Sequence, residues 1–291
     1  MKFLIKKLIL ILRYFISFLK KSFNCYISSK GLNFLAKQSK KIIYIRKIFD
    51  TELKIIAQTD YAIERQATSI FKNINDIYWG IKSLNLKNFT MLDIGANVGV
   101  YSLAAIHLGA KNVISFEPGP THKKLIENIN LNNLNDKIKI YKLAVGLKKS
   151  VMRSYEDKNN LGNSILVNNI KDLNLKHTNA QFSDEYIEVE VDKLDNIDKK
   201  YEFGKIDLIK VDVEGMEFDV LKGAEEIIIK NYPIIVAETF TSMNLFRNNK
   251  DTDYLFEYLY SHGYRSFEWR NNKFAEFKFS NLKYQDTFFI H

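Results

Sequence analysis

A short buried strand near residue 89 leads into a glycine turn and then into a helix. The strand covers residues 89–94 and includes Asp93, glycines follow at positions 95 and 99, and a helix is predicted over residues 100–108. Glycine allows a sharp turn and close approach of a ligand to the backbone. The first N–H groups of the helix point at the same place. This pattern predicts a small-molecule site where the strand ends.

A second predicted strand, residues 112–117, ends in Glu117. In doubly wound α/β domains an acid at this place holds a ribose diol, so the two strands predict a nucleoside-binding unit. A dinucleotide fingerprint needs more closely spaced glycines. Here the turn reads Gly95, Asn97, Gly99 and follows Asp93, whose carboxylate would repel a pyrophosphate but suits a methionine amino group. The spacing favours S-adenosylmethionine over NAD, and a tight turn without any ligand is the alternative.

Strands and helices alternate through the rest of the body, which predicts an α/β fold with a mostly parallel sheet covered on both faces. An insertion over residues 148–205 interrupts the alternation. Predicted strands lie at 89–94, 112–117, 138–145, 206–213 and 234–238, with two strand-like runs at 164–167 and 186–191 inside the insertion and a terminal hairpin of 265–269 with 287–290. Predicted helices lie at 100–108, 121–132, 216–230 and 251–262.

Carboxylates lie at the carboxyl ends of four of these strands: Asp93, Glu117, Asp212 with Glu214 just after it, and Glu238. Each acid alone is typical of a helix cap. Ligands of an open parallel sheet bind outside the carboxyl ends of its strands, and four ends with acids indicate a site. Asp212 or Glu238 could act as general base for a hydroxyl, or both could hold a divalent cation through oxygen ligands. The sequence leaves both roles open.

The net charge of +9 is a property of the N-terminal segment. Residues 1–49 contain ten lysines, two arginines and no acid, and the remaining residues carry a net charge of −3. This distribution does not support nucleic-acid binding by the body. Cys25 is the single cysteine, which excludes an internal disulfide and a cysteine zinc cluster.

Residues 1–30 are predicted to form a basic amphipathic helix, with an apolar face over residues 2–24 opposite Lys2, Lys6, Arg13 and Lys20. That pattern is typical of a helix in an anionic membrane interface. The apolar run is too short to span a bilayer, which takes about 20 residues. A secretory signal, or a helix packed on protein, is the alternative.

The body resembles the FkbM family of S-adenosylmethionine-dependent methyltransferases. The resemblance covers roughly residues 88–291. It lies in the turn from Asp93 to Ser102, in Phe116-Glu117-Pro118, in the run from Lys210 to Glu217, in Leu221-Lys-Gly223-Ala224, in Tyr186–Asp195 and in Thr287–Ile290.

The resemblance implies a seven-stranded Rossmann-like sheet and methylation of a hydroxyl, often on a sugar or other secondary metabolite. The implied cofactor contacts are Asp93, Gly95, Ala96, Asn97 and Gly99 for the methionine part and Glu117 for the ribose. The third strand lacks the acid that commonly meets the adenine amine, so Ala144 offers only backbone and packing.

Residues 31–87, which fall outside the resemblance, are predicted to form a helical cap between the basic helix and the methyltransferase domain at residues 88–291. We expect an O-methyltransferase that acts on a glycan or lipid-linked sugar, peripheral on the inner face of a membrane in the cytoplasm. The candidate catalytic residues are Asp212, Glu238 and Glu214, with Asp212 and Glu238 as ligands of any metal ion.

Three alternatives remain. An enzyme that methylates an amino group of a nucleic acid would need an Asn/Asp-Pro-Pro-Tyr loop after the fourth strand, where this chain has Asp212-Val-Glu-Gly. A dehydrogenase is disfavoured by the glycine spacing. A membrane-associated scaffold would keep the fold without turnover. The sequence does not identify the acceptor, metal dependence or oligomeric state.

Overall fold

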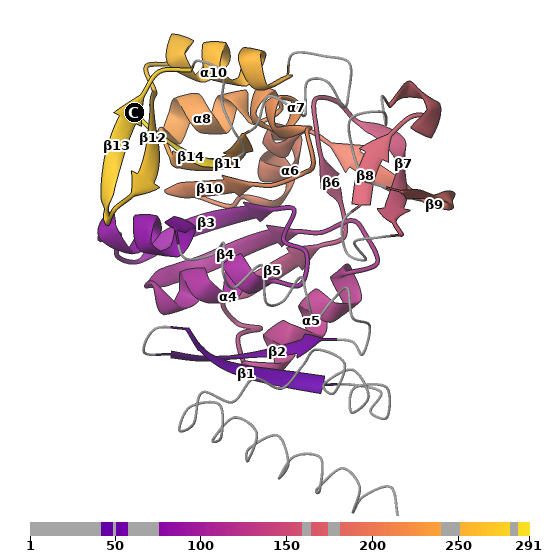
Figure 1. Ribbon diagram of the computed structural model, residues 1–291, viewed down its shortest axis with the longest axis horizontal. Helices are drawn as coiled ribbons and strands as arrows, with labels where there is room; N and C mark the ends of the chain where they lie inside the picture. The colour runs from indigo at the N-terminus through magenta and orange to yellow at the C-terminus, as the bar shows by residue number, and fades with distance from the viewer. Residues whose placement is uncertain are drawn as a thin grey trace, which may run out of the picture.

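The computed structural model describes residues 42–48, 51–57, 76–158, 164–173, 181–239, 251–279 and 285–291. Within these residues an eight-stranded sheet forms the centre of the molecule (Figure 1). Its strand order is β13-β12-β14-β11-β10-β3-β4-β5. The strands are β3 (Phe89–Ile94), β4 (Ala110–Phe116), β5 (Ile138–Tyr141), β10 (Leu208–Val211), β11 (Ile234–Thr239), β12 (Arg265–Arg270), β13 (Lys273–Phe277) and β14 (Gln285–Ile290).

The five strands β11, β10, β3, β4 and β5 are parallel to one another. Next to β11, the strands β14, β12 and β13 add an antiparallel edge. The predicted mostly parallel α/β sheet is confirmed, with eight strands where seven were expected. The extra strand is β13, which pairs with β12 across Asn271 and Asn272. Both asparagines have left-handed φ angles, 52° and 60°, as a two-residue type I′ hairpin turn requires. The predicted pairing of 265–269 with 287–290 is present between β12 and β14.

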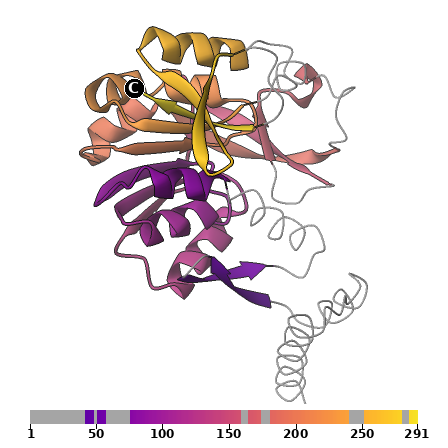
Figure 2. The ribbon, with the colours of Figure 1, turned by 60° about the vertical axis from the view of Figure 1, so that its left-hand side comes forward.

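Helices cover both faces of this sheet (Figures 1 and 2). One hydrophobic cluster joins one face to residues 76–83, which are helical, and to α4 (Val100–His107) and α5 (His122–Leu131). The other joins the opposite face to α6 (Leu194–Tyr201), α7 (Glu217–Lys222), α8 (Glu225–Asn231) and α10 (Asp251–Ser261). Burial on both faces explains why β3 and β10 are buried along their whole length.

The insertion forms a second sheet of four strands, in the order β6-β9-β7-β8. Its strands are β6 (Ala144–Val145), β7 (Ser150–Asp157), β8 (Ser164–Val167) and β9 (Phe182–Asp192), and a short 3₁₀ helix, η1 (Ile170–Asp172), follows β8. The strand predicted over 138–145 is therefore two strands, because Ala144 and Val145 pair with β9 rather than with β4. The prediction missed β7 and α6, whose sequences mix polar and apolar residues.

Residues 42–48 and 51–57 form an antiparallel hairpin, β1 (Ile42–Ile48) and β2 (Thr51–Ala57). The prediction of a helical cap over residues 31–87 is therefore wrong for these two strands, whereas residues 76–83 are helical as expected. The β1 sequence, Ile-Ile-Tyr-Ile-Arg-Lys-Ile, is rich in β-branched residues, which favour strands over helices.

Residues 1–30, with the predicted amphipathic helix, lie outside the described residues. Among the described residues, none of the helices has the length and apolar character needed to cross a membrane.

Candidate active site at the carboxyl edge of the parallel strands

The chain leaves β3 in one direction toward β4 and β5, and it later fills the other side of β3 with β10 and β11. The strand order thus reverses between β3 and β10, and ligands of open α/β sheets bind in the crevice at such a point. The loops that follow these two strands touch there. The N–H of Asp212 donates to the carbonyl of Ile94 at 3.0 Å, and a Cβ on Gly95 would lie 1.8 Å from the Asp212 carbonyl oxygen.

The turn from Gly95 to Gly99 has left-handed backbone at alternate residues, with φ of 80° at Gly95, 51° at Asn97 and 89° at Gly99. Glycine and asparagine are the residues that adopt this conformation at least cost. The N–H groups of Gly95 and Ala96 both donate to the carbonyl of Phe116, each at 3.0 Å. The turn is thereby tied to the end of β4, next to Glu117.

Glu117 joins two loops at this edge. Its Oε2 accepts from the N–H of Asn97 and its Oε1 from the N–H of Gly119, both at 2.8 Å. Burial raises the pKa of this carboxyl, and the two backbone donors oppose the shift. The carboxylate also accepts a hydrogen bond from the side chain of Thr121, and about four lone-pair sites are available on its two oxygens, so it keeps acceptor capacity for one further donor. The contact of Glu117 with a ribose remains a prediction.

Asp93 lies beneath the turn in a row of buried polar side chains. Ser102, from α4, donates to Asp93 and is 2.8 Å from the hydroxyl of Ser115 on β4. The Nζ of Lys210 lies 3.7 Å from Asp93 Oδ1. Burial raises the pKa of Asp93, and Lys210 acts in the opposite direction. Asp93 is 0% exposed, and its side chain contacts Ser102 and Lys210. Its direct contact with a methionine group remains a prediction.

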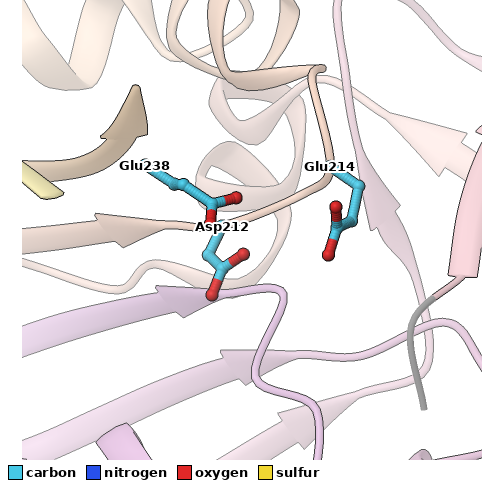
Figure 3. A group of neighbouring side chains, drawn as sticks. All are labelled: Asp212, Glu214 and Glu238. Carbon is cyan, nitrogen blue, oxygen red and sulfur yellow. The ribbon is translucent and has the colours of Figure 1, made fainter. Parts of the chain in front are cut away.

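Three carboxylates form a cluster next to Lys210, which contacts one of them. Asp212 and Glu214 lie on the loop after β10, and Glu238 lies near the end of β11 (Figure 3). One carboxylate oxygen of each residue lies within 4.8 Å of one oxygen of each of the others, and all three residues are half-buried. The structure thus brings together all three predicted catalytic residues. Such a group can accept a proton from a hydroxyl or bind a divalent cation, and these roles remain predictions.

Glu217, at the start of α7, holds the loop that carries Asp212 and Glu214. Its Oε1 accepts from the N–H groups of Val213 and Gly215, at 3.0 and 3.2 Å. Glu214 has a left-handed φ of 54°, which is unfavourable for this residue type. The two bonds stabilise a turn that the backbone alone disfavours. Burial raises the pKa of Glu217 from 4.5 to about 6.

Glu217 is expected to make stability depend on pH. Because its pKa is higher in the folded than in the unfolded protein, stability falls as the pH rises from 4.5 to about 6. The expected loss is about 2 kcal/mol, at 1.36 kcal/mol per pKa unit. Glu217→Gln keeps an acceptor for both N–H groups and should lack this dependence. In urea unfolding, wild type should lose about 2 kcal/mol relative to Glu217→Gln between pH 4 and 8.

Glu217→Ala is the complementary variant because it leaves two backbone donors without their acceptor. It should be less stable than Glu217→Gln at every pH, by about 1–3 kcal/mol per unsatisfied group. Equal stability of the Gln and Ala variants would show that Glu217 does not hold the loop.

Ala144 lies elsewhere than the sequence indicated. It does not continue β5 but packs with Met216 and Val191 in the core between the second sheet and the loop after β10. Its contact with an adenine remains a prediction. Through Ala144 the second sheet packs against Met216, which follows the loop that carries Asp212 and Glu214.

Sequence reasoning missed four polar residues at this site: Ser102, Lys210, Glu217 and Asp286. Lys210 stands in an otherwise apolar strand, and a buried lysine needs acidic partners, which was a usable signal. Asp286 pairs in register with Glu238, and burial together with Asp212 raises its pKa to about 7. The position of Asp286 at the site could not be predicted from the sequence, because its pairing with Glu238 depends on which strand lies next to β11.

The fold and the site together define an open α/β protein with a glycine turn where the strand order reverses and three clustered carboxylates at the same edge of the sheet. The methyltransferase FkbM domain family matches residues 93–266. The chain belongs to this family, so it is an S-adenosylmethionine-type methyltransferase. The family expectation drawn from the sequence is confirmed.

Two fungal proteins are similar in sequence. Methyltransferase sdnD of Sordaria araneosa is 29% identical over 188 residues, which cover 57% of this chain and 72% of that protein. Methyltransferase 1 of Beauveria bassiana is 27% identical over 146 residues, or 47% of this chain. The latter match spans 58% of the relative's length.

Among solved structures, methyltransferase FkbM from Methylobacillus flagellatus is 14% identical, with a TM-score of 0.44. That alignment covers 80% of this chain and 62% of the other chain.

Proposed function

We propose that this methyltransferase transfers a methyl group from S-adenosylmethionine to a hydroxyl of a sugar in a surface glycan or lipid-linked saccharide. The observation that carries the proposal is the group formed by Asp212, Glu214 and Glu238 at the carboxyl edge, with one oxygen of each residue within 4.8 Å of the others. A hydroxyl is a poor nucleophile until its proton is accepted, and carboxylates are suited to accept it.

The cofactor supplies an electrophilic methyl group on a positively charged sulfur. The Gly95–Gly99 turn would form part of the cofactor site. Position 95 needs glycine because a Cβ there would lie 1.8 Å from the carbonyl oxygen of Asp212, so the turn packs directly against the loop that carries this acid. Glu117 would accept hydrogen bonds from the ribose hydroxyls. Asp212 or Glu238 would take the proton of the acceptor hydroxyl, whose oxygen would receive the methyl group as S-adenosylhomocysteine leaves. In-line positioning supplies much of the rate.

The same carboxylates would be the ligands if the reaction needs a divalent cation. Six or more oxygen ligands, some from water, are usual for Mg²⁺ and Ca²⁺, and three protein carboxylates leave room for water and substrate. Loss of methyl transfer in EDTA, with recovery on adding Mg²⁺, would assign them to metal binding. Full activity in EDTA would assign them to proton transfer alone.

The acceptor is tested by mass spectrometry of surface glycans and lipid-linked saccharides from cells with and without the gene. The proposal expects one saccharide species to lose a single methyl group when the gene is absent. Unchanged saccharides together with an under-methylated nucleic acid or small molecule would contradict it. An intact methylation pattern throughout would favour the scaffold alternative.

We further propose that residues 1–30 hold the protein on the inner face of an anionic membrane. This basic segment carries no acid before Asp50, and each basic residue near an anionic bilayer contributes about 1 kcal/mol. The full chain should pellet with anionic vesicles, detach only in part at high salt, and stay in the supernatant when residues 1–30 are removed.

The shortened chain should still bind S-adenosylhomocysteine, because the first strand of the main sheet begins at Phe89. A full-length chain that stays in the supernatant with anionic vesicles at low salt would contradict membrane binding. Resistance to carbonate extraction would instead indicate a spanning anchor.

A further inference from the structure

Lys210 is a buried lysine in the central strand β10, with 2% of its surface exposed. A buried ammonium is costly unless it is paired and hydrogen-bonded. Its Nζ lies 3.1 Å from Asp212 Oδ2 and 3.7 Å from Asp93 Oδ1. Burial alone would lower the pKa of Lys210, but Asp212 and Asp93 raise it above its ordinary value, so the side chain is charged at neutral pH.

The lysine also reaches the cofactor turn. Its Nζ donates to the carbonyl of Gly95 at 3.4 Å and lies 4.5 Å from the centre of the Tyr101 ring on α4. One ammonium therefore contacts the end of β3, the glycine turn, the first turn of α4 and the acid that follows β10. Within the described residues, no other cationic group forms an ion pair with Asp93 or Asp212.

We propose that Lys210 is a positioning residue, which fixes the Gly95 turn and the Asp212 carboxylate relative to each other. The inference rests on the proposed function, because it takes the turn as the cofactor cradle and Asp212 as the acid beside the reacting atoms. Asp93, paired in register with Lys210 on the neighbouring strand, holds the ammonium in place. Replacing a buried ion pair with apolar groups is often neutral for stability, so geometry is the better reason for a lysine here.

Lys210 could act in two ways, and a single substitution does not distinguish them. If Lys210 only neutralises the buried Asp93, its removal should leave cofactor affinity unchanged once Asp93 is also neutral, because its other partner, Asp212, is partly exposed to solvent. If Lys210 positions the turn, its removal should weaken cofactor binding whether or not Asp93 is charged. Comparison of Lys210→Met in the wild-type and Asp93→Asn backgrounds distinguishes these cases, in the manner of a double-mutant cycle.

The experiment measures S-adenosylhomocysteine affinity by calorimetry and the unfolding midpoint in urea for wild type, Lys210→Met, Asp93→Asn and the double variant. Lys210→Met should lower affinity about tenfold in both backgrounds. It should lower stability strongly in the wild-type background and only slightly in the Asp93→Asn background. Lys205→Met is the matched control, because Lys205 pairs with Asp207 at 2.7 Å at the opposite end of the strand and is mostly exposed; its affinity should equal that of wild type.

Unchanged affinity on removing Lys210 in the Asp93→Asn background would overturn the proposal, even if Lys210→Met alone fails to fold. Recovery of both stability and affinity in the double variant would likewise assign Lys210 a purely structural role. If wild type itself binds neither S-adenosylmethionine nor S-adenosylhomocysteine, the proposed function fails rather than the role of Lys210 alone. The wild-type titration thus distinguishes the two failures.

Discussion

Replacing Asp212 with asparagine is expected to reduce methyl transfer about 100-fold or more, as for a lost acid–base group. The affinity for S-adenosylhomocysteine should stay within a few-fold of wild type. Asparagine keeps an oxygen that can accept from Lys210, whose Nζ lies 3.1 Å from Asp212 Oδ2, and the backbone bond to Ile94 is unaffected. The fold and cradle should therefore persist while the proton acceptor is lost.

The rate is measured as transfer of a labelled methyl group from S-adenosylmethionine into a lipid-linked saccharide fraction. Asp207→Asn is a matched control at the other end of β10, where asparagine can still accept from the N–H of Thr90, as Asp207 Oδ2 does at 3.0 Å. It should leave the rate unchanged. Unchanged rates in both Asp212→Asn and Glu238→Gln would refute a catalytic role for these carboxylates.

Replacing Glu117 with alanine is expected to weaken S-adenosylhomocysteine binding by about 1.5–3 kcal/mol, the cost of losing a charged hydrogen-bonding group. This corresponds to roughly 10- to 150-fold in affinity. The variant loses the predicted ribose acceptor. It also loses the bonds to the N–H groups of Asn97 and Gly119, so the glycine turn loses a support as well. Calorimetry measures the loss directly.

Glu117→Gln separates these two effects. Glutamine keeps one carbonyl oxygen for a backbone donor but offers only that one acceptor atom, so its affinity should lie between those of wild type and Glu117→Ala. Stability should follow the same order. An alanine variant that binds as tightly as wild type would place the ribose elsewhere.

Buried apolar runs and glycine turns in the sequence made much of the main sheet predictable. The strand over 89–94 and the helix starting at 100 agree with β3 and α4, because a fully buried strand and a glycine turn leave a strong local pattern. The register that brings Lys210 beside Asp93 was not predictable from local pattern. It depends on β10 inserting next to β3 rather than β5, which is a long-range pairing.

The less predictable parts are those whose strands pair across the insertion or near the N-terminus. β7 mixes charged and apolar residues and is stabilised by pairing with β8 and β9, which a local pattern does not reveal. The β1–β2 hairpin was predicted as helix, although its isoleucines favour a strand. At the site, the acids could be recognised in the sequence because each lies at or just after the end of a strand. Glu217 and Asp286 could not, because they act through the loop and the strand beside them.

The central claim is that S-adenosylmethionine binds at the carboxyl ends of β3 and β10, where the strand order reverses. Its most direct test is calorimetric titration of the wild-type protein with S-adenosylhomocysteine and, separately, with NAD. We predict saturable binding of S-adenosylhomocysteine at one site per chain and no heat of binding for NAD. Tight binding of NAD with no response to S-adenosylhomocysteine would contradict the claim.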